Sequence, residues 1–392
     1  MAKIDPLLQK LVELGASDLH LSSANPPLIR LHGDIKPLEG YGVQSAQDVR
    51  GMITEIMSER NRKQFEEDND TDLAYEIKDL ARFRVNIFHD RMGPGTVIRV
   101  IPSKILTTEQ LKLPDAVLKL CYLTKGLVVV TGPTGSGKST TLAAMVDLVN
   151  RSRKDHIVTI EDPIEFVHPN KLCLLNQREV GVHTKSFSRA LRAALREDPN
   201  IVLVGEMRDL ETVAIAIETA ETGHLVFGTL HTTTAASTVD RIIDQFPADR
   251  QAQIRVMLAT SLKAVVAQTL CKKADGKGRV AALEVLIVNP AVASLIRDMK
   301  TVMINNIMQT GKKFGMQLLN DSLEEFAKNK VITADEAYLK SVEKDDMVNR
   351  LTRLGLKVSQ MDKAEGAAQP AAAAAAGAEK SLTMWRRRQQ QT

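Results

Sequence analysis

The sequence predicts an α/β protein in which a small α+β domain precedes a larger domain of parallel βαβ units. Three observations support this fold class. The chain has 392 residues, more than one typical domain contains. Short strand patterns mixed with helical ones fill about the first hundred residues, and apolar strands separated by longer helices follow from residue 115. The stretch 102–114, which begins and ends with proline, is typical of a linker.

The first domain is predicted to span residues 1–101. Apolar residues at helical spacing predict a helix from Asp5 to Leu14, which Gly15 ends. A charged amphipathic helix is expected over about 45–65. Alternating apolar and polar residues predict strands at 18–22, 28–31, about 71–77, about 82–88 and about 96–101.

The second domain is predicted to span residues 115–362, and its helical patterns continue to about Val358. Its apolar strand candidates are 127–131, 157–160, 201–204, 225–229 and 280–288. From Lys363 the chain is rich in alanine and offers no apolar face that could dock on the domain. We therefore expect a disordered tail over 363–392.

Composition and charge restrict the possible function classes. The 44% hydrophobic and 26% charged residues are typical of a globular protein. The net charge is only +4, with both signs interleaved, so no nucleic-acid partner is expected. Cys121, Cys173 and Cys271 lie far apart, which argues against a zinc ribbon or disulfide framework and favours a reducing compartment. Signal-peptide and membrane-spanning patterns are absent, so any membrane association is expected to be peripheral.

A phosphate-binding loop follows the first strand of the second domain. The pattern G-x-x-x-x-G-K-[ST] has an apolar strand before it and a helix after it, which is the context this motif requires. Its backbone N–H groups can surround an anion at the helix N-terminus. Lys138 is expected to reach the β and γ phosphates of ATP, and Ser139 to ligate Mg²⁺. The residues predicted to bind nucleotide are Gly132, Pro133, Thr134, Gly135, Ser136, Gly137, Lys138, Ser139 and Thr140.

Further polar residues follow other strands of this domain. Glu206 follows the strand 201–204 after a single glycine, at the edge where parallel sheets bind ligands, so we expect it near Mg²⁺. Glu161 follows the strand 157–160 and can polarise the attacking water. His231 stands just past the strand 225–229 and can sense the γ phosphate. Taken singly, each of these residues also suits a structural role, as does His224.

Phosphoryl transfer also requires positive charge at the γ phosphate, and an arginine often supplies it. The first domain offers Arg82, Arg84, Arg91 and Arg99 as candidates. Spacing does not choose among them, and each by itself is more typical of a surface charge than of an arginine that contacts the γ phosphate.

Together these motifs resemble the secretion-type ATPases that power type II secretion, type IV pili and type IV secretion. The phosphate loop is followed in family order by the acidic segment 159–165, the Walker B segment 203–209 and the histidine segment 220–231. The resemblance runs from about residue 3 to 358. Within the superfamily the chain is most similar to the retraction ATPases of type IV pili, in the strings at 15–22, 81–86, 176–180 and 195–199.

This resemblance implies a PAS-like N-terminal domain followed by a RecA-like P-loop ATPase domain. It implies a cytoplasmic homohexamer, peripheral at the inner membrane, that docks on a platform protein of the pilus machinery and powers retraction and twitching motility. It also implies that Glu206 and Glu161 act in catalysis, and that Arg84 and Arg99 reach bound ATP. One segment departs from the family pattern, because 291–297 lacks an internal arginine and asparagine.

Alternatives remain at this point. A pilus extension or type II secretion ATPase would use the same chemistry, although the chain lacks an extra N-terminal module and paired CxxC motifs. An accessory retraction ATPase is a closer alternative, which the strings at 131–135 and 205–209 disfavour. A RecA-like nucleic-acid translocase is opposed by the charge balance and by the few aromatic residues. A scaffold that binds ATP without turnover is opposed by Lys138, Glu161 and Glu206 occurring together.

Overall fold

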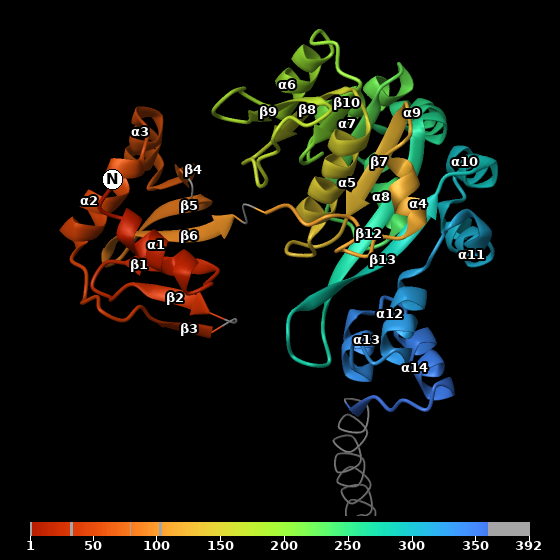
Figure 1. Ribbon diagram of the computed structural model, residues 1–392. Helices are drawn as coiled ribbons and strands as arrows, with labels where there is room; N and C mark the ends of the chain where they lie inside the picture. The colour runs from red at the N-terminus through yellow and green to blue at the C-terminus, as the bar shows by residue number, and fades with distance from the viewer. Residues whose placement is uncertain (1, 32–33, 79, 102–103, 360–392) are drawn as a thin grey trace, which may run out of the picture. The chain divides into compact units, whose positions relative to one another are not determined.

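The computed structural model describes residues 2–31, 34–78, 80–101 and 104–359 (Figure 1). Contacts divide the chain into two compact units. Of the described residues, the first unit contains those within 1–113, 118–128 and 139–229, and the second contains those within 114–117, 129–138 and 230–359. The domain boundaries proposed from the sequence stay a prediction, and the expected tail over 363–392 lies outside the described residues.

An antiparallel six-stranded sheet lies in the first unit, in the order β3-β2-β1-β6-β5-β4. Its strands are β1 (Asp18–Ser22), β2 (Leu28–Leu31), β3 (Asp34–Pro37), β4 (Asp70–Ile77), β5 (Ala81–Asp90) and β6 (Gly93–Ile101). The five predicted strands are confirmed. β3 was not predicted, because its four residues are all exposed and carry no alternating apolar pattern.

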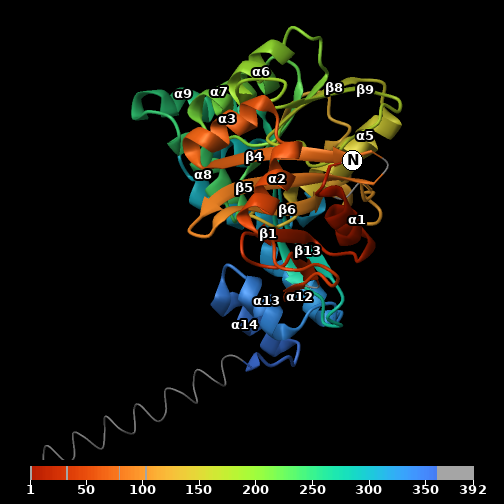
Figure 2. The ribbon, with the colours of Figure 1, turned by 90° about the vertical axis from the view of Figure 1, so that its left-hand side faces the viewer.

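Three helices, α1 (Asp5–Glu13), α2 (Ala46–Ile56) and α3 (Glu59–Asp68), cover one face of this sheet (Figures 1 and 2). Burial alternates along β5: Phe83, Val85 and Ile87 are fully buried in the core that the helices share. Since side chains alternate between the faces of a strand, Arg82 and Arg84 project from the other face.

The single helix predicted over 45–65 is wrong, because two helices occupy this stretch. Met57 adopts an extended conformation, with φ −81° and ψ 134°, and ends α2. The Ser58 hydroxyl then accepts a hydrogen bond from the N–H of Asn61 and caps α3. A serine that satisfies free N–H groups favours a new helix start at this position.

The second sheet has seven strands in the order β13-β12-β7-β11-β10-β8-β9. They are β7 (Gly126–Thr131), β8 (His156–Glu161), β9 (Leu174–Glu179), β10 (Ile201–Val204), β11 (Leu225–Leu230), β12 (Leu262–Lys272) and β13 (Arg279–Ile287). Strands β9, β8, β10 and β11 pair in parallel, whereas β12 and β13 form an antiparallel pair. Every residue of β7, β10 and β11 is buried, as expected for a sheet covered on both faces.

The helices that accompany this sheet are α4 (Asp115–Leu120), α5 (Lys138–Ser152), α6 (Phe187–Ala194), α7 (Leu210–Glu221), α8 (Ala235–Asp244) and α9 (Ala248–Ser261). Helix α5 is buried from Thr141 to Asn150. None of the helices in the described part of the chain combines the length and apolar character needed to cross a bilayer.

A group of short helices completes the second unit. It comprises α10 (Pro290–Arg297), α11 (Ile304–Thr310), α12 (Leu319–Lys328), α13 (Ala334–Lys340) and α14 (Lys344–Arg353), with 3₁₀ turns η1 (Thr301–Met303) and η2 (Lys312–Phe314). Leu323 of α12 and Leu351 of α14 form a buried cluster with Cys271 of β12 and Ala282 of β13. This cluster fixes the last three helices to the β12–β13 hairpin.

Candidate nucleotide site

The predicted phosphate loop connects β7 to α5, and its shape depends on glycine. Gly132, Gly135 and Gly137 have φ angles of 147°, 77° and 87°, which residues with a Cβ rarely adopt. A Cβ on Gly132 would collide with the carbonyl oxygen of Gln268, and one on Gly137 would lie 2.8 Å from the Gln268 side-chain nitrogen. Glycine at these two positions therefore permits the loop to curl against β12.

Gln268 braces this loop, and sequence reasoning missed it. Its side chain is buried, and its Nε2 donates a hydrogen bond to the carbonyl oxygen of Ser136 at 2.6 Å. A buried hydrogen bond of this kind holds the loop in one conformation, since breaking it would leave polar atoms unpaired. Gln268 lies on β12, a strand that the sequence did not predict, so no signal pointed to it.

Lys138 opens α5 and extends along the loop. Its Nζ donates to the carbonyl oxygens of Gly132 at 2.7 Å and Pro133 at 3.3 Å. The Nδ1 atom of His231 lies 3.5 Å from the same nitrogen. The next residue, Thr232, accepts a hydrogen bond through its carbonyl oxygen from the Thr131 hydroxyl at 2.8 Å. The end of β7 thus holds the segment that carries His231 beside the phosphate loop.

The two predicted catalytic carboxylates lie at neighbouring strand ends. Glu161 is the last residue of β8, and Glu206 follows β10 by two positions. The parallel register pairs Ile160 with Val204, and the N–H of Gly205 donates to the carbonyl oxygen of Ile160 at 2.7 Å. A Cβ on Gly205 would lie only 3.2 Å from the Glu161 Cα, so glycine allows this close approach.

A small cavity of about 40 Å³ joins these elements within the first unit. Ser139 lines it from the first turn of α5, Glu161 and Thr159 from β8, Gly205 from the end of β10, and Thr229 from β11. A cavity of this size has room for at least one water molecule, and its polar lining groups offer that water hydrogen-bond partners beside apolar ones such as Phe166 and Leu203. The predicted metal ligand Ser139 therefore shares one cavity with Glu161 and with the strand end that precedes Glu206.

The environment of Glu161 raises its proton affinity while holding it in place. Burial raises the pKa of its carboxyl. Three hydrogen bonds oppose this effect, donated by the Thr159 hydroxyl at 2.7 Å, the Gln177 Nε2 at 3.2 Å and the Glu165 N–H at 3.4 Å. A fixed carboxylate of raised basicity is suited to orient and polarise a water molecule.

Glu206 forms an ion pair with Arg208, whose side chain is mostly exposed. The hydrogen bond to Glu206 raises the pKa of the Arg208 guanidinium. Arg208 was not a predicted site residue, although it lies in the segment 203–209 that carries the family resemblance.

A family model described as a type II/IV secretion system protein matches residues 1–339 of the chain. The chain belongs to the type II/IV secretion system protein family. PilT of Pseudomonas aeruginosa, named as a type IV pilus retraction ATPase, is 52% identical over 334 residues, which cover 85% of this chain and 96% of that protein. A twitching motility protein of Neisseria gonorrhoeae is 50% identical over 321 residues, which cover 82% of this chain and 86% of that one.

One solved structure is similar over nearly the same length. The crystal structure of the pilus retraction motor PilT with bound ADP matches with a TM-score of 0.82 at 44% identity, and the match covers 88% of this chain and 99% of that chain. The α/β fold class predicted from the sequence, an α+β part followed by a RecA-like P-loop part, is confirmed for this member of the secretion-system family.

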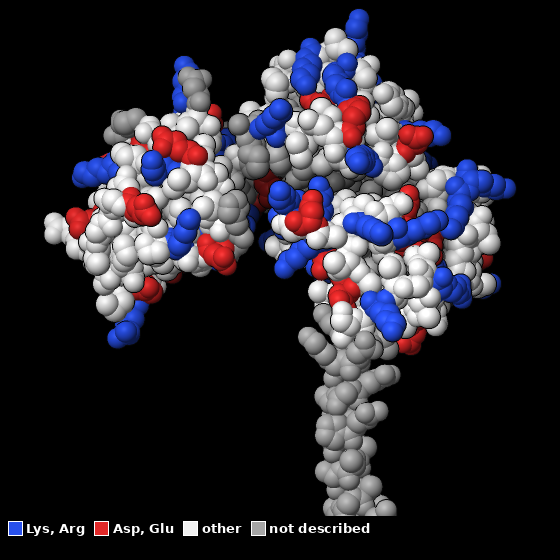
Figure 3. Space-filling view, turned by 60° about the horizontal axis from the view of Figure 1, so that its bottom comes forward, with Lys and Arg blue, Asp and Glu red and all other residues white. Residues whose placement is uncertain are grey.

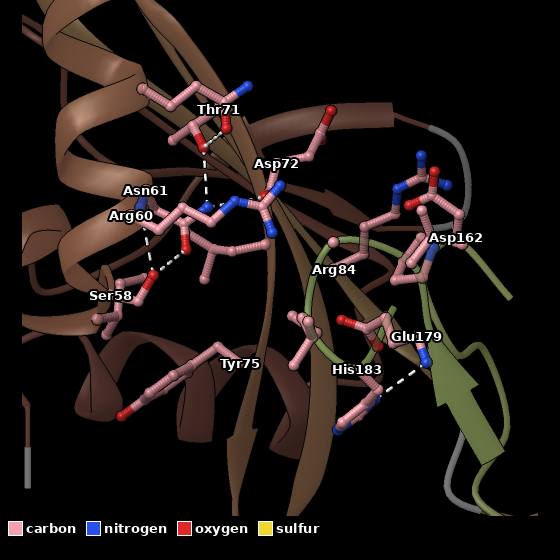
Figure 4. A pocket seen from close by; sticks show the side chains of 18 of the residues that line it. Ser58, Arg60, Asn61, Thr71, Asp72, Tyr75, Arg84, Asp162, Glu179 and His183 are labelled. Atoms are coloured by element: carbon pink, nitrogen blue, oxygen red, sulfur yellow. Dashed lines mark hydrogen bonds between the residues drawn. The ribbon is translucent and has the colours of Figure 1, made fainter. Parts of the chain in front are cut away.

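In this secretion-system protein, Arg84 lines a larger pocket of about 1040 Å³ in the first unit (Figure 4). Asp162, the residue after Glu161, lines the same pocket, and the two side chains lie close together in Figure 4. Burial raises the pKa of the Asp162 carboxyl, and the charge of Arg84 opposes this effect. Arg82 of the same strand donates through Nη2 to the Glu179 Oε2 at 2.6 Å. Arg84 therefore lies beside Asp162, which follows Glu161 in the chain.

Arg99 is placed differently. The β5–β6 register sets it directly opposite Arg84, on the same face of the sheet. Its Nε donates to the Oδ1 of Asp18 at 2.7 Å. Burial raises the pKa of the Asp18 carboxyl, but the hydrogen bonds from Ser17 and Arg99 outweigh it and lower the pKa overall. The Arg99 guanidinium therefore has a structural partner within the N-terminal sheet, whereas Arg84 faces the Asp162 segment.

Proposed function

We propose that this chain is a motor ATPase that hydrolyses ATP with Mg²⁺ to power retraction of a type IV pilus. The observation that carries the proposal is the shared cavity of Ser139 and Glu161 at the end of β10, in a chain with a glycine-shaped phosphate loop. The 52% identity to a retraction ATPase over 96% of that protein's length supports the direction of the work.

The residues take separate roles in this proposal. Lys138 places positive charge at the β and γ phosphates, and the loop N–H groups surround them. Ser139 and Glu206 hold Mg²⁺, for which oxygen ligands are suited. Mg²⁺ held by these residues would supply positive charge that stabilises the charge developing on the phosphates. Glu161 orients the attacking water, and His231 contacts the γ phosphate from beside Lys138.

Arginines of the N-terminal sheet supply the remaining positive charge. Arg84 is the first choice because it lies beside Asp162, next to the water-orienting Glu161. Arg99 is the second choice, since its guanidinium already binds Asp18. Either can act on nucleotide held by the same chain or by a neighbouring copy.

The assembly that follows from the family resemblance is a cytoplasmic homohexamer. It would dock on a platform protein of the pilus machinery at the inner membrane. Each cycle of binding and hydrolysis would move the N-terminal sheet relative to the phosphate loop, because Arg84 loses its attraction when the γ phosphate leaves. A ring whose subunits make this movement one after another would exert force on the platform protein.

Other function classes have less support. A pilus extension or type II secretion ATPase would share the site, and only the direction of work separates it from the proposal. For a nucleic-acid translocase a broad basic surface is expected. On the face shown in Figure 3, acidic side chains lie among the basic ones in the described part of the chain.

Deletion of the gene tests the direction of work. If the chain powers retraction, the deletion strain should carry excess surface pili and lose twitching, and the wild-type gene should restore both. Cells without surface pili would instead indicate an extension ATPase, and unchanged pili and motility would contradict any role in the pilus.

A further inference from the structure

Strand β9 contributes a side chain that was not a predicted site residue, although it lies in the string 176–180 that carries the family resemblance. β9 runs parallel to β8, and the register sets Gln177 opposite Thr159, two residues before Glu161. On parallel strands, side chains of paired residues project from the same face. Gln177 thus lies on the same side of the sheet as Thr159 and Glu161, within reach of both the carboxylate and the segment that follows it.

The carboxamide of Gln177 uses both of its ends. Its Nε2 donates to the Oε1 of Glu161 at 3.2 Å and to the carbonyl oxygen of Phe166 at 2.8 Å. Its Oε1 accepts a hydrogen bond from the backbone N–H of His168 at 2.8 Å. The opposite orientation of the amide would set its oxygen against two acceptors and its nitrogen against a donor. The surrounding groups therefore fix this orientation.

These bonds join the Glu161 carboxylate to the segment 162–168. Gln177 forms hydrogen bonds with this segment at Phe166 and His168. The segment also contacts the carboxylate directly, because the Glu165 N–H donates a hydrogen bond to the Glu161 Oε2 at 3.4 Å. The Oε1 of Glu161 accepts two shorter bonds, from Thr159 and Gln177. Oε2 thus has the greater capacity left for a water molecule in the adjoining cavity.

We propose that Gln177 is a positioning residue that holds the Glu161 carboxylate, and the segment behind it, in the orientation needed for hydrolysis. This inference rests on the proposed role of Glu161. Gln177 itself touches no reacting atom. Its expected effect is on turnover rather than on nucleotide affinity, because the phosphate loop is held separately by Gln268.

The test compares Gln177→Met with Asn176→Ala in the full-length protein. Methionine keeps the length of the side chain and removes its hydrogen bonds. Asn176 is a matched control, since it lies on the opposite face of β9 and accepts a hydrogen bond from His156 at 2.8 Å. Gln177→Met should lower kcat for ATP about 10- to 100-fold, as removal of a group that orients a catalytic ligand commonly does. KM should change less than about threefold, and Asn176→Ala should stay within about twofold of wild type in both constants.

A double variant separates positioning from a general structural role. Glu161→Gln alone should abolish most turnover, and adding Gln177→Met should then cost less than about twofold more, because the group being positioned is already absent. Losses that multiply in the double variant would overturn the inference, as would a Gln177→Met protein of normal kcat beside an inactive Glu161→Gln protein.

A failure of the proposed function would give a different result from a failure of the inference about Gln177. A fully active Glu161→Gln protein would remove the assigned role of Glu161, and with it the role of Gln177. Thermal unfolding with and without ADP checks that each variant folds and binds nucleotide. If Gln177→Met does not fold, Gln177→Asn replaces it, since the shortened amide keeps its polarity but cannot reach Glu161, and the same fall in kcat is expected.

Discussion

The two sheets carry their candidate functional residues in different places. In the N-terminal sheet β5 alternates between a buried face and an open one, and Arg82 and Arg84 stand on the open face. In the second sheet β7, β10 and β11 are buried at every position, so no face is free. Its candidate catalytic residues Glu161, Glu206 and His231 lie at or just beyond strand ends.

This difference explains why the same kind of substitution should have different effects in the two sheets. A one-sided antiparallel sheet can change polar residues on its open face without disturbing its core. A sheet buried on both faces can place chemistry only where its strands end, and those positions depend on close backbone contacts such as that of Gly205.

The largest effects are expected at the strand ends of the second sheet. Lys138→Ala should reduce ATP turnover to background and weaken ATP binding, because it removes the charge at the phosphates. Glu206→Gln should also reduce turnover to background but retain ATP, since a neutral amide still fits the site. Steady-state turnover and a fluorescent-nucleotide binding assay measure the two properties. Equal loss of binding in both variants would contradict the roles assigned to these residues.

The open face of the N-terminal sheet should show the next largest effect. Arg84→Ala should lower kcat about 10³-fold, the lower range for removal of an arginine that neutralises the γ phosphate. Arg99→Ala is the matched variant on the same face and should lower kcat less than about tenfold, because Arg99 is engaged with Asp18. Recovery of activity on mixing inactive Arg84→Ala and Lys138→Ala proteins would place Arg84 in a neighbouring subunit. Normal turnover of Arg84→Ala would refute its role.

A substitution on the buried face of β5 should lower the stability of the fold rather than act on turnover directly. Phe83→Ala should lower the free energy of unfolding by about 3–5 kcal/mol, since Phe83 is fully buried among the helices of the N-terminal sheet. Arg84→Ala, one residue away on the open face, should change it by less than about 0.5 kcal/mol. Chemical denaturation of both variants measures the difference. Equal losses of unfolding free energy in the two variants would contradict the distinction between a buried core face and an exposed polar face of β5.

A smaller effect should come from pH. Burial lowers the pKa of the His168 imidazole to about 4, with Asp147 opposing and Lys171 adding to the shift. Between about pH 6.5 and 4 the unfolded chain binds a proton that the folded chain does not, so stability should fall by up to about 3 kcal/mol as pH decreases through this range. His168→Phe should remove this component. An unchanged pH dependence of unfolding in that variant would contradict the prediction.

Much of the fold and part of the site followed from local sequence signals. The phosphate loop was predictable because strand, glycines, lysine and helix lie within a short segment. Glu161 and Glu206 were predictable because each follows an apolar strand. β9 was missed, since its exposed Leu174 and polar Asn176 to Glu179 give no apolar run. β12 was missed because it continues directly from α9 without a breaking residue.

The supporting side chains could not be predicted, and the reason is sequence distance. Gln268 binds Ser136 across 132 positions, and Arg82 binds Glu179 across 97. Gln177 lies only 16 positions from Glu161, yet its role depends on the parallel β8–β9 register. A glutamine on a strand carries no signal of its own. Tertiary structure alone brings these side chains to the groups they bind, through strand order for Gln177 and Gln268 and through a contact between strands of different sheets for Arg82.

Retraction of single labelled pili tests the central claim most directly. The measurement compares cells in which this chain is the sole retraction ATPase with cells that carry its Lys138→Ala variant instead. If ATP hydrolysis at this site powers retraction, wild-type cells should shorten their pili and variant cells should show none of this active retraction, with normal amounts of protein. Pili that retract at wild-type speed in the Lys138→Ala cells would contradict the account.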